Sequence, residues 1–349
     1  MAVLKDHLLR EVITDVYAQG PKVGTRIITG LPIIERFILS GKVPFRVFCQ
    51  IIMDEVTITF ISPGIVRMTY RDDQWMLRSV FLNILFINWA RKLKMEAFEW
   101  MYGSLRSGYS RILAENSDVT ELSVDNNRFN DWATILKAFP NLVFLRTSAR
   151  NFSSMLFCSS ALLVFLKGIS LKNDQSFVDA HEALAKHQSK FPRLETVQYT
   201  DASLGQIRFP KNASVLSIKH LIIETDVKCC TPWNFSFLKA AENMFPSLKS
   251  VEIVATKTIF SCPYSLHDDD DSKLKSFEEF YRAFDALNFG FDVEIYYEES
   301  IFAREPVLNK LRQFCATKGK IYGDSQKFTV VTTAPRKRLT FSVESEFKF

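Results

Sequence analysis

The residues that could carry out chemistry in this sequence are few, and their spacing matches no common catalytic or metal-binding pattern. No two histidines lie four residues apart, the spacing that places two metal ligands on one face of a helix; they are His7, His181, His187, His220 and His267. The six cysteines contain no C-x-x-C pair, and the sequence has no glycine-rich phosphate loop and no hydrolase motif. These observations predict a protein that is not an enzyme and that uses no metal and no cofactor.

Two features keep chemical alternatives open. A cysteine acting with His220 as nucleophile and base would make a Cys-dependent hydrolase, which is our third hypothesis. The acidic run Asp268–Asp271, within "HDDDDSK", lacks fixed ligand spacing, so we interpret it as a solvated loop. The sequence does not decide whether that loop has a function.

The charge and hydropathy of the chain bear on its partners and location. Its 44 Lys and Arg face 39 Asp and Glu, and the resulting net charge of +5 does not by itself predict nucleic-acid binding. The alternative of a nucleic-acid-associated protein rests on the basic stretch Pro335–Arg338 and on scattered lysines. The longest apolar runs, 79–90 and 155–166, are shorter than the roughly 20 residues that cross a bilayer. Without a signal-peptide pattern, we expect an intracellular protein, cytoplasmic or nuclear, with no membrane partner.

Six loose L-x-x-L-x-L frames predict a series of strands. They begin at 119, 142, 166, 194, 218 and 248, with separations of 23, 24, 28, 24 and 30 residues. Such a period is typical of leucine-rich repeats. Between the frames, apolar residues at helical spacing predict helices over 129–139, 176–191 and 234–245.

The motif Phe-Pro-x-Leu occurs three times, at Phe139, Phe191 and Phe245. Proline cannot continue a helix and favours an extended residue before it. Each motif therefore predicts where a helix ends and the chain turns back to a strand, with the Phe filling the seam between helix and sheet.

Residues 119–260 resemble leucine-rich-repeat proteins of the ribonuclease-inhibitor-like kind. The resemblance implies an α/β solenoid with a parallel concave sheet and outer helices. Within residues 31–53, Leu31-Pro32, Ile38-Leu39 and Cys49 resemble a degenerate F-box of the divergent nematode F-box receptors. That second resemblance implies a substrate receptor of a cullin ubiquitin ligase, bound to a Skp-type adaptor.

The flanking segments predict further elements. Residues 1–118 form an α+β region with a hairpin over 54–72 and a helix that follows from Trp75. Residues 261–349 form an α/β cap behind the acidic loop. In this cap we expect a helix from Ser276, a strand over 291–299, a helix from Pro306 to Gly319 and a hairpin of 327–333 with 339–344.

Alternation along each predicted strand places the residues between the apolar positions on the opposite, concave face, where stacking would align them in columns. These columns mix charged, amide, hydroxyl and aromatic side chains, which favours protein recognition. We predict a non-enzymatic protein-interaction scaffold whose partner binds at Phe144, Arg146, Lys172, Gln198, His220, Glu224 and Glu252.

Overall fold

The computed structural model describes residues 40–62, 65–70, 73–77, 88–95, 118–125, 132–172, 177–227, 234–257, 270–301, 305–324 and 326–345. The fold is α/β with mostly parallel strands, as predicted. The chain divides into two compact units, Met1–Leu166 and Lys167–Phe349. The predicted domain limits at 118 and 260 stay predictions.

The first unit places its strands in the order β6-β5-β4-β1-β2-β3. Strands β1, β4, β5 and β6 run parallel, and β2 and β3 are antiparallel additions at the edge. The described elements are α3 (Lys42–Asp54), β1 (Val56–Ser62), β2 (Ile65–Tyr70), β3 (Asp73–Leu77), β4 (Lys92–Met95), β5 (Glu121–Val124), α6 (Trp132–Ala138), β6 (Phe144–Ser148) and α7 (Ala149–Cys158).

The hairpin predicted over 54–72 is confirmed by the antiparallel pairing of β1 with β2. The helix predicted to begin at Trp75 is wrong at its start, because 73–77 forms strand β3, in which Trp75 lies opposite Met68 of β2. A short apolar run fits both a helical and a strand period, and pairing with β2 decided between them. The rest of that predicted helix, over 78–87, lies outside the described residues.

The second unit holds the strand order β12-β13-β14-β11-β10-β9-β8-β7. Neighbouring strands from β7 to β11, and β11 with β14, are parallel, and β13 and β12 complete an antiparallel edge. Its elements are β7 (Gly168–Lys172), α8 (Phe177–Lys186), η2 (Gln188–Lys190), β8 (Thr196–Thr200), η3 (Leu204–Gln206), β9 (His220–Asp226), α9 (Phe237–Met244), β10 (Ser250–Lys257), α10 (Asp270–Asp285), β11 (Asp292–Ile301), α11 (Glu305–Ala316), β12 (Lys320–Gly323), β13 (Lys327–Ala334) and β14 (Lys337–Ser345).

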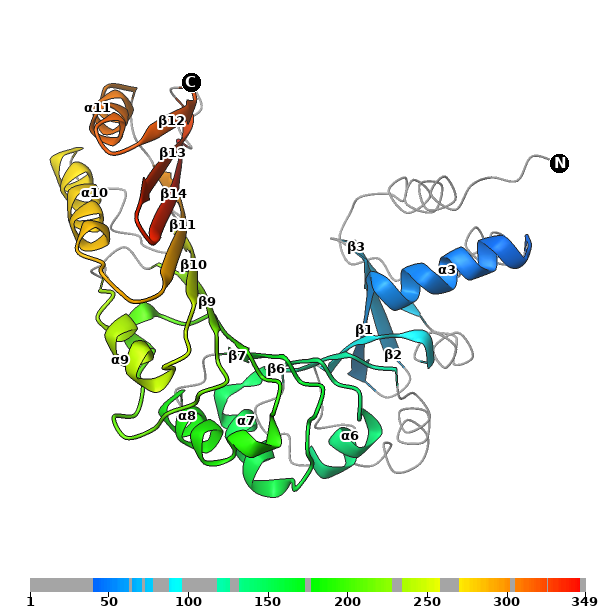
Figure 1. Cartoon of the computed structure of the whole chain (residues 1–349). Helices are drawn as coiled ribbons and strands as arrows, with labels where there is room; N and C mark the ends of the chain where they lie inside the picture. The colour runs from blue at the N-terminus through cyan, green and yellow to red at the C-terminus, as the bar shows by residue number, and fades with distance from the viewer. Residues whose placement is uncertain are drawn as a thin grey trace. The chain divides into compact units, whose positions relative to one another are not determined.

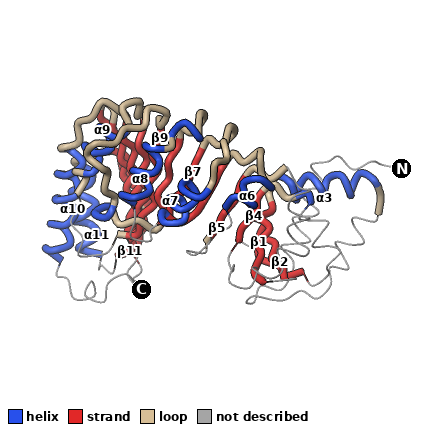
Figure 2. Tube along the Cα trace, turned by 90° about the horizontal axis from the view of Figure 1, so that it is seen from below, coloured by secondary structure: helices blue, strands red, loops and turns tan. Residues whose placement is uncertain are grey.

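Helices cover one face of the second unit's sheet. Figure 1 shows α8, α9 and α10 on the same side of the strands, and Figure 2 shows the strands of this unit side by side. No described helix covers the other face. We call that side of each unit's sheet, the side opposite the helices, its open face.

The six apolar frames lie where the sequence predicted strands, in or immediately before β5 to β10. Their residues are buried except Leu248, which is half-buried. The apolar positions of each frame therefore form the helix-facing core, while the alternate positions point to the open face.

The Phe-Pro motifs end helices as predicted. Phe139 and Phe245 directly follow α6 and α9, and both are fully buried, as is Phe191. Phe191 and Phe245 have non-helical ψ angles of 64° and 77°, in agreement with the restriction that the next proline imposes. The helix predicted through 191 is shorter than expected, since α8 ends at Lys186 and a 3-10 turn leads to Phe191.

The parallel series continues beyond residue 260. The strand predicted over 291–299 is β11, which pairs with the whole length of β10. The predicted C-terminal hairpin is confirmed as β13 and β14. The helix predicted from Ser276 begins earlier, at Asp270, so the second half of the acidic run is helical and not a loop. Acidic residues are favourable in the first turn of a helix, which explains the earlier start. Asp268 lies outside the described residues.

Candidate functional site

The open face of the second unit carries polar side chains in matched rows. The register aligns Gly168, Thr196, His220 and Ser250 in one row, as the sequence predicted. The next row joins Ser170, Gln198, Ile222 and Glu252, and the pairing of Glu224 with Val254 belongs to a third. Strands β11 and β14 extend the rows with residues that the sequence reasoning did not include: Asp292, Glu294, Tyr296, Arg338 and Thr340.

Exposure on this face differs from strand to strand. Ser170 on β7 is fully buried, and Gln198 on β8 is 9% exposed. From β9 to β11 the open-face positions are half-buried or exposed, including His220, Glu224 and Glu252. The open-face positions of β14 are also half-buried or exposed, so the part of this face that a partner could reach extends from β9 through β10 and β11 to β14.

Hydrogen bonds and ion pairs tie several of the predicted residues to their neighbours. The Gln198 amide donates from Nε2 to Glu224 Oε1 at 2.7 Å. His220 Nδ1 lies 2.8 Å from Ser250 Oγ on the adjacent strand. The ammonium group of Lys172 lies 3.3 Å from the Asp201 carboxylate. Five of the seven predicted site residues thus belong to one sheet face of the second unit.

The other two predicted residues lie on β6 in the first unit. Phe144 is half-buried and Arg146 is exposed on the open face, where they pair in register with Glu121 and Ser123 of β5. Lys94 on β4 extends this face and lies 2.9 Å from Asp125. This unit therefore presents basic and aromatic side chains from the expected positions.

The His220–Ser250 hydrogen bond has the length that a nucleophile–base pair needs. The neighbouring carboxylate, Glu195, could orient the histidine, but Lys219 binds it at 2.5 Å. The hydrogen bond and charge of that lysine lower the pKa of Glu195. The His220–Ser250 pair lies on the open sheet face, and Glu195 and Lys219 directly precede β8 and β9, so we interpret both contacts as surface links between neighbouring strands.

The described cysteines differ in burial and in the pKa of their thiols. Burial raises the pKa of Cys315 to about 12, which keeps its thiol protonated. Burial also raises the pKa of Cys49, and Cys158 is an exposed free thiol at the end of α7. The hydrogen bond of His220 Nδ1 goes to Ser250, and the hydrolase hypothesis stays a prediction.

His181 is fully buried and is held by two hydrogen bonds. Its Nδ1 lies 2.9 Å from the carbonyl oxygen of Arg208, and its Nε2 lies 2.7 Å from the Tyr199 hydroxyl. A carbonyl can only accept, so Nδ1–H is the donor and Nε2 accepts from Tyr199. Burial lowers the pKa of His181 to about 4. The ring stacks on Phe209 and serves the core, not the surface.

A second buried polar cluster joins the carboxyl ends of β10 and β11. Lys257 Nζ lies 2.6 Å from Glu299 Oε1, and the Tyr297 hydroxyl donates to Glu299 Oε2 at 2.5 Å. Burial and the adjacent carboxylate raise the pKa of Tyr297. Both oxygens of Glu299 are satisfied, so the cluster is a structural link between the two strands.

The basic stretch that supported the nucleic-acid alternative is used within the second unit. Lys337 Nζ donates to the carbonyl oxygens of Phe284 and Asp285 at the end of α10 and of Leu287 just after it. Arg336 donates to the carbonyl of Gly290. The third basic residue, Arg338, lies 3.5 Å from Glu294. All three basic side chains thus have partners within the second unit, although Arg336 and Arg338 remain exposed.

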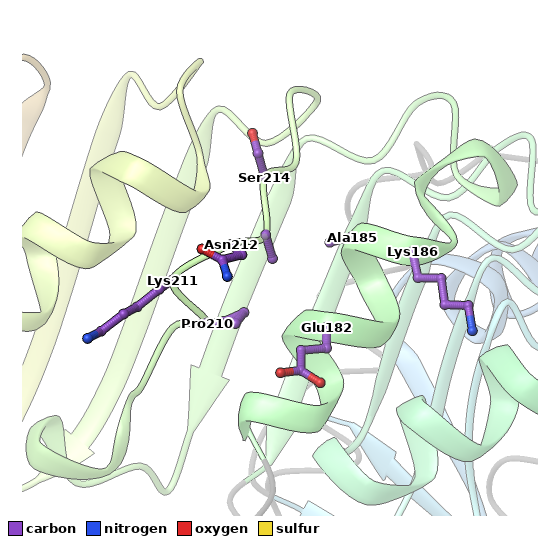
Figure 3. A pocket seen from close by; sticks show the side chains of 8 residues that line it. Glu182, Ala185, Lys186, Pro210, Lys211, Asn212 and Ser214 are labelled. Carbon is purple, nitrogen blue, oxygen red and sulfur yellow. The ribbon is translucent and has the colours of Figure 1, made fainter.

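A depression of about 550 Å³ lies on the helix-covered side, between α8 and the loop before β9. Its polar lining comes from Glu182, Lys186, Lys211, Asn212 and Ser214. Figure 3 shows the Lys186 and Lys211 side chains pointing away from each other. The charged groups do not converge, so this depression does not resemble a small-molecule site.

Comparisons with known proteins found no match. No protein-family model, no curated protein sequence and no solved structure matches the chain. Within the ranges given above, no group of three His, Cys, Asp or Glu side chains could hold a metal ion. None of the described helices combines the length and apolarity needed to cross a bilayer.

Proposed function

We propose that this protein is a non-enzymatic interaction scaffold, related to leucine-rich-repeat proteins, that binds another protein through its open face. The observation that supports the proposal is the in-register rows of reachable polar side chains on β9, β10 and β11. Adjacent parallel strands hold such rows at fixed spacing, so a partner meets a rigid and chemically varied surface. Because no family model matches the chain, the relationship to leucine-rich-repeat proteins is part of this proposal.

Site-specific cross-linking tests this function. A photoreactive phenylalanine analogue replaces Phe144 or His220 on the open faces, and in control proteins replaces Glu182 on α8 or Arg282 on α10. We expect a discrete product at the open-face positions, with a protein that mass spectrometry identifies and that forms the same product when purified. Products only at the helix positions, or none, would contradict the proposal.

We further propose that residues 31–53 bind a Skp-type adaptor and make the protein a substrate receptor of a cullin ubiquitin ligase inside the cell. The F-box resemblance is the support. Of its residues, Cys49 lies in α3, whereas Leu31-Pro32 and Ile38-Leu39 lie outside the described residues. We expect the adaptor to co-purify with the full chain and to be lost when 1–53 are deleted. Unchanged recovery, or no adaptor at all, would remove the ligase proposal and leave the scaffold proposal standing.

A further inference from the structure

The part of the second unit's open face that lies on β9, β10 and β11 is strongly acidic. Six carboxylates occupy open-face positions of β9, β10 and β11, and no Lys or Arg stands at such a position on these three strands. We call this surface the acidic face; its residues are Glu224, Asp226, Glu252, Asp292, Glu294 and Glu298. The chain as a whole carries a net charge of +5, so this concentration of negative charge is local.

The acidic face contains a pairing that works against stability. Glu252 on β10 lies directly opposite Glu294 on β11. Like charges at opposite positions of neighbouring strands destabilise a sheet. Arg338 lies 3.5 Å from Glu294 and compensates the charge of that carboxylate. Glu252 makes no ion pair with any described residue. Departures of this kind from local rules are characteristic of functional surfaces.

The pKa of Tyr296 is sensitive to the negative charge of this surface. Its pKa is raised, first by a hydrogen bond to Glu294, then by burial and by the negative charges of Glu294 and Glu252. A potential that opposes a tyrosinate anion attracts a cation. Tyr296 is 36% exposed, so a cationic side chain could also lie over its ring.

Apolar side chains alternate with the carboxylates. Ile222 pairs in register with Glu252, and Val254 stands between Glu224 and Tyr296 in the next row. The chemistry of Lys and Arg fits this alternation, because their aliphatic stems pack on apolar groups while their charged ends reach carboxylates.

We propose that the acidic face binds a lysine- and arginine-rich segment of a partner protein. This inference rests on the proposed scaffold function and names the chemistry of its partner. The negative charge of the acidic face favours a positively charged segment as its partner. A nucleic acid would meet six carboxylates here and be repelled. Lys219 and Lys249 lie one residue before β9 and β10, so the segment is expected toward the carboxyl-terminal halves of the strands.

The test uses the full chain and fluorescein-labelled nona-lysine, with nona-glutamate as the control peptide, in anisotropy titrations at low ionic strength. The variant Glu252→Gln/Glu294→Gln removes two charges from the acidic face. Its matched control, Glu278→Gln/Glu279→Gln, removes two charges from exposed positions of α10. We expect nona-lysine to bind the wild type, the acidic-face variant to bind about tenfold more weakly, and the control to change less than about twofold.

Each alternative outcome has a definite meaning. No binding of nona-lysine, or equal losses in both variants, would overturn the inference, because attraction would then reflect the overall charge and not the acidic face. A cross-linked partner at His220 together with either of those results would leave the scaffold function intact and refute only the basic partner. Urea unfolding of both variants checks that neither loses its fold.

Discussion

Acidification should destabilise the second unit through His181. The unfolded histidine has a pKa near 6.5, whereas burial lowers the pKa of the folded one to about 4. Above pH 6.5 the ring is neutral in both states, and its buried contacts contribute fully to stability. As the pH falls from 6.5 toward 4, His181 binds a proton in the unfolded state but not in the folded state, so the free energy of unfolding decreases.

The magnitude follows from the difference between the two pKa values. One pKa unit corresponds to about 1.4 kcal/mol, so the loss attributable to His181 approaches about 3 kcal/mol by pH 4. This is a large part of the stability of an ordinary domain, which is roughly 5–15 kcal/mol. The two hydrogen bonds explain why the folded state resists protonation of His181. Protonating Nε2 would place a second donor against the Tyr199 hydroxyl, and that hydroxyl would have to reorient.

Urea unfolding followed by circular dichroism at several pH values measures this slope. In wild-type protein we expect the free energy of unfolding to fall between pH 6.5 and 4 more steeply than in His181→Gln, by about 1.4 kcal/mol per pH unit. The control His220→Gln leaves the buried network intact, so the contribution of His181 to the slope should remain. Equal slopes in wild type and His181→Gln, or an NMR titration of the His181 ring with a midpoint above about pH 6, would refute the reasoning.

Three further predictions concern stability and are measured by urea unfolding. Phe245→Ala should cost about 3–5 kcal/mol because it empties the seam between α9 and the sheet, whereas Phe157→Ala, at a position 63% exposed, should have little effect; similar losses would contradict the role of the motif. Lys337→Met should cost about 1–2 kcal/mol, since it removes the cation that binds the last carbonyls of α10, and an unchanged midpoint would exclude this role. Glu252→Gln should stabilise the protein by roughly 0.2–1 kcal/mol at low salt by ending repulsion with Glu294, and a destabilised variant would show that this repulsion is absent.

The distribution of charge explains why overall composition is a poor guide to the partner. A net charge of +5 coexists with an acidic face, because basic residues serve elsewhere. Lys337 binds a helix end and Arg336 binds the carbonyl of Gly290. Charge counted along the chain therefore describes solubility and long-range attraction, while the sheet register determines which charges face a partner together.

The sequence alone determined the alternation of strand and helix, because apolar spacing and Phe-Pro-x-Leu act locally. The frames at 194 and 218 became β8 and β9, and buried Phe191 and Phe245 stand where helical backbone ends. Columns through Gln198 and His220 were also predictable, since frames of equal form align in register. The candidate residues on β9 and β10 followed from that alignment.

Only the tertiary structure decided the rest. The helix predicted to begin at Trp75 starts instead as part of strand β3, because short apolar runs fit two periods and the neighbouring strand β2 selects one. Glu252 and Glu294 come from separate repeats, and Arg338 comes from the C-terminal hairpin. They become neighbours only in the folded sheet. Local patterns state which way a side chain points along its own strand; which side chains become its neighbours depends on strand order, and strand order is a property of the folded chain.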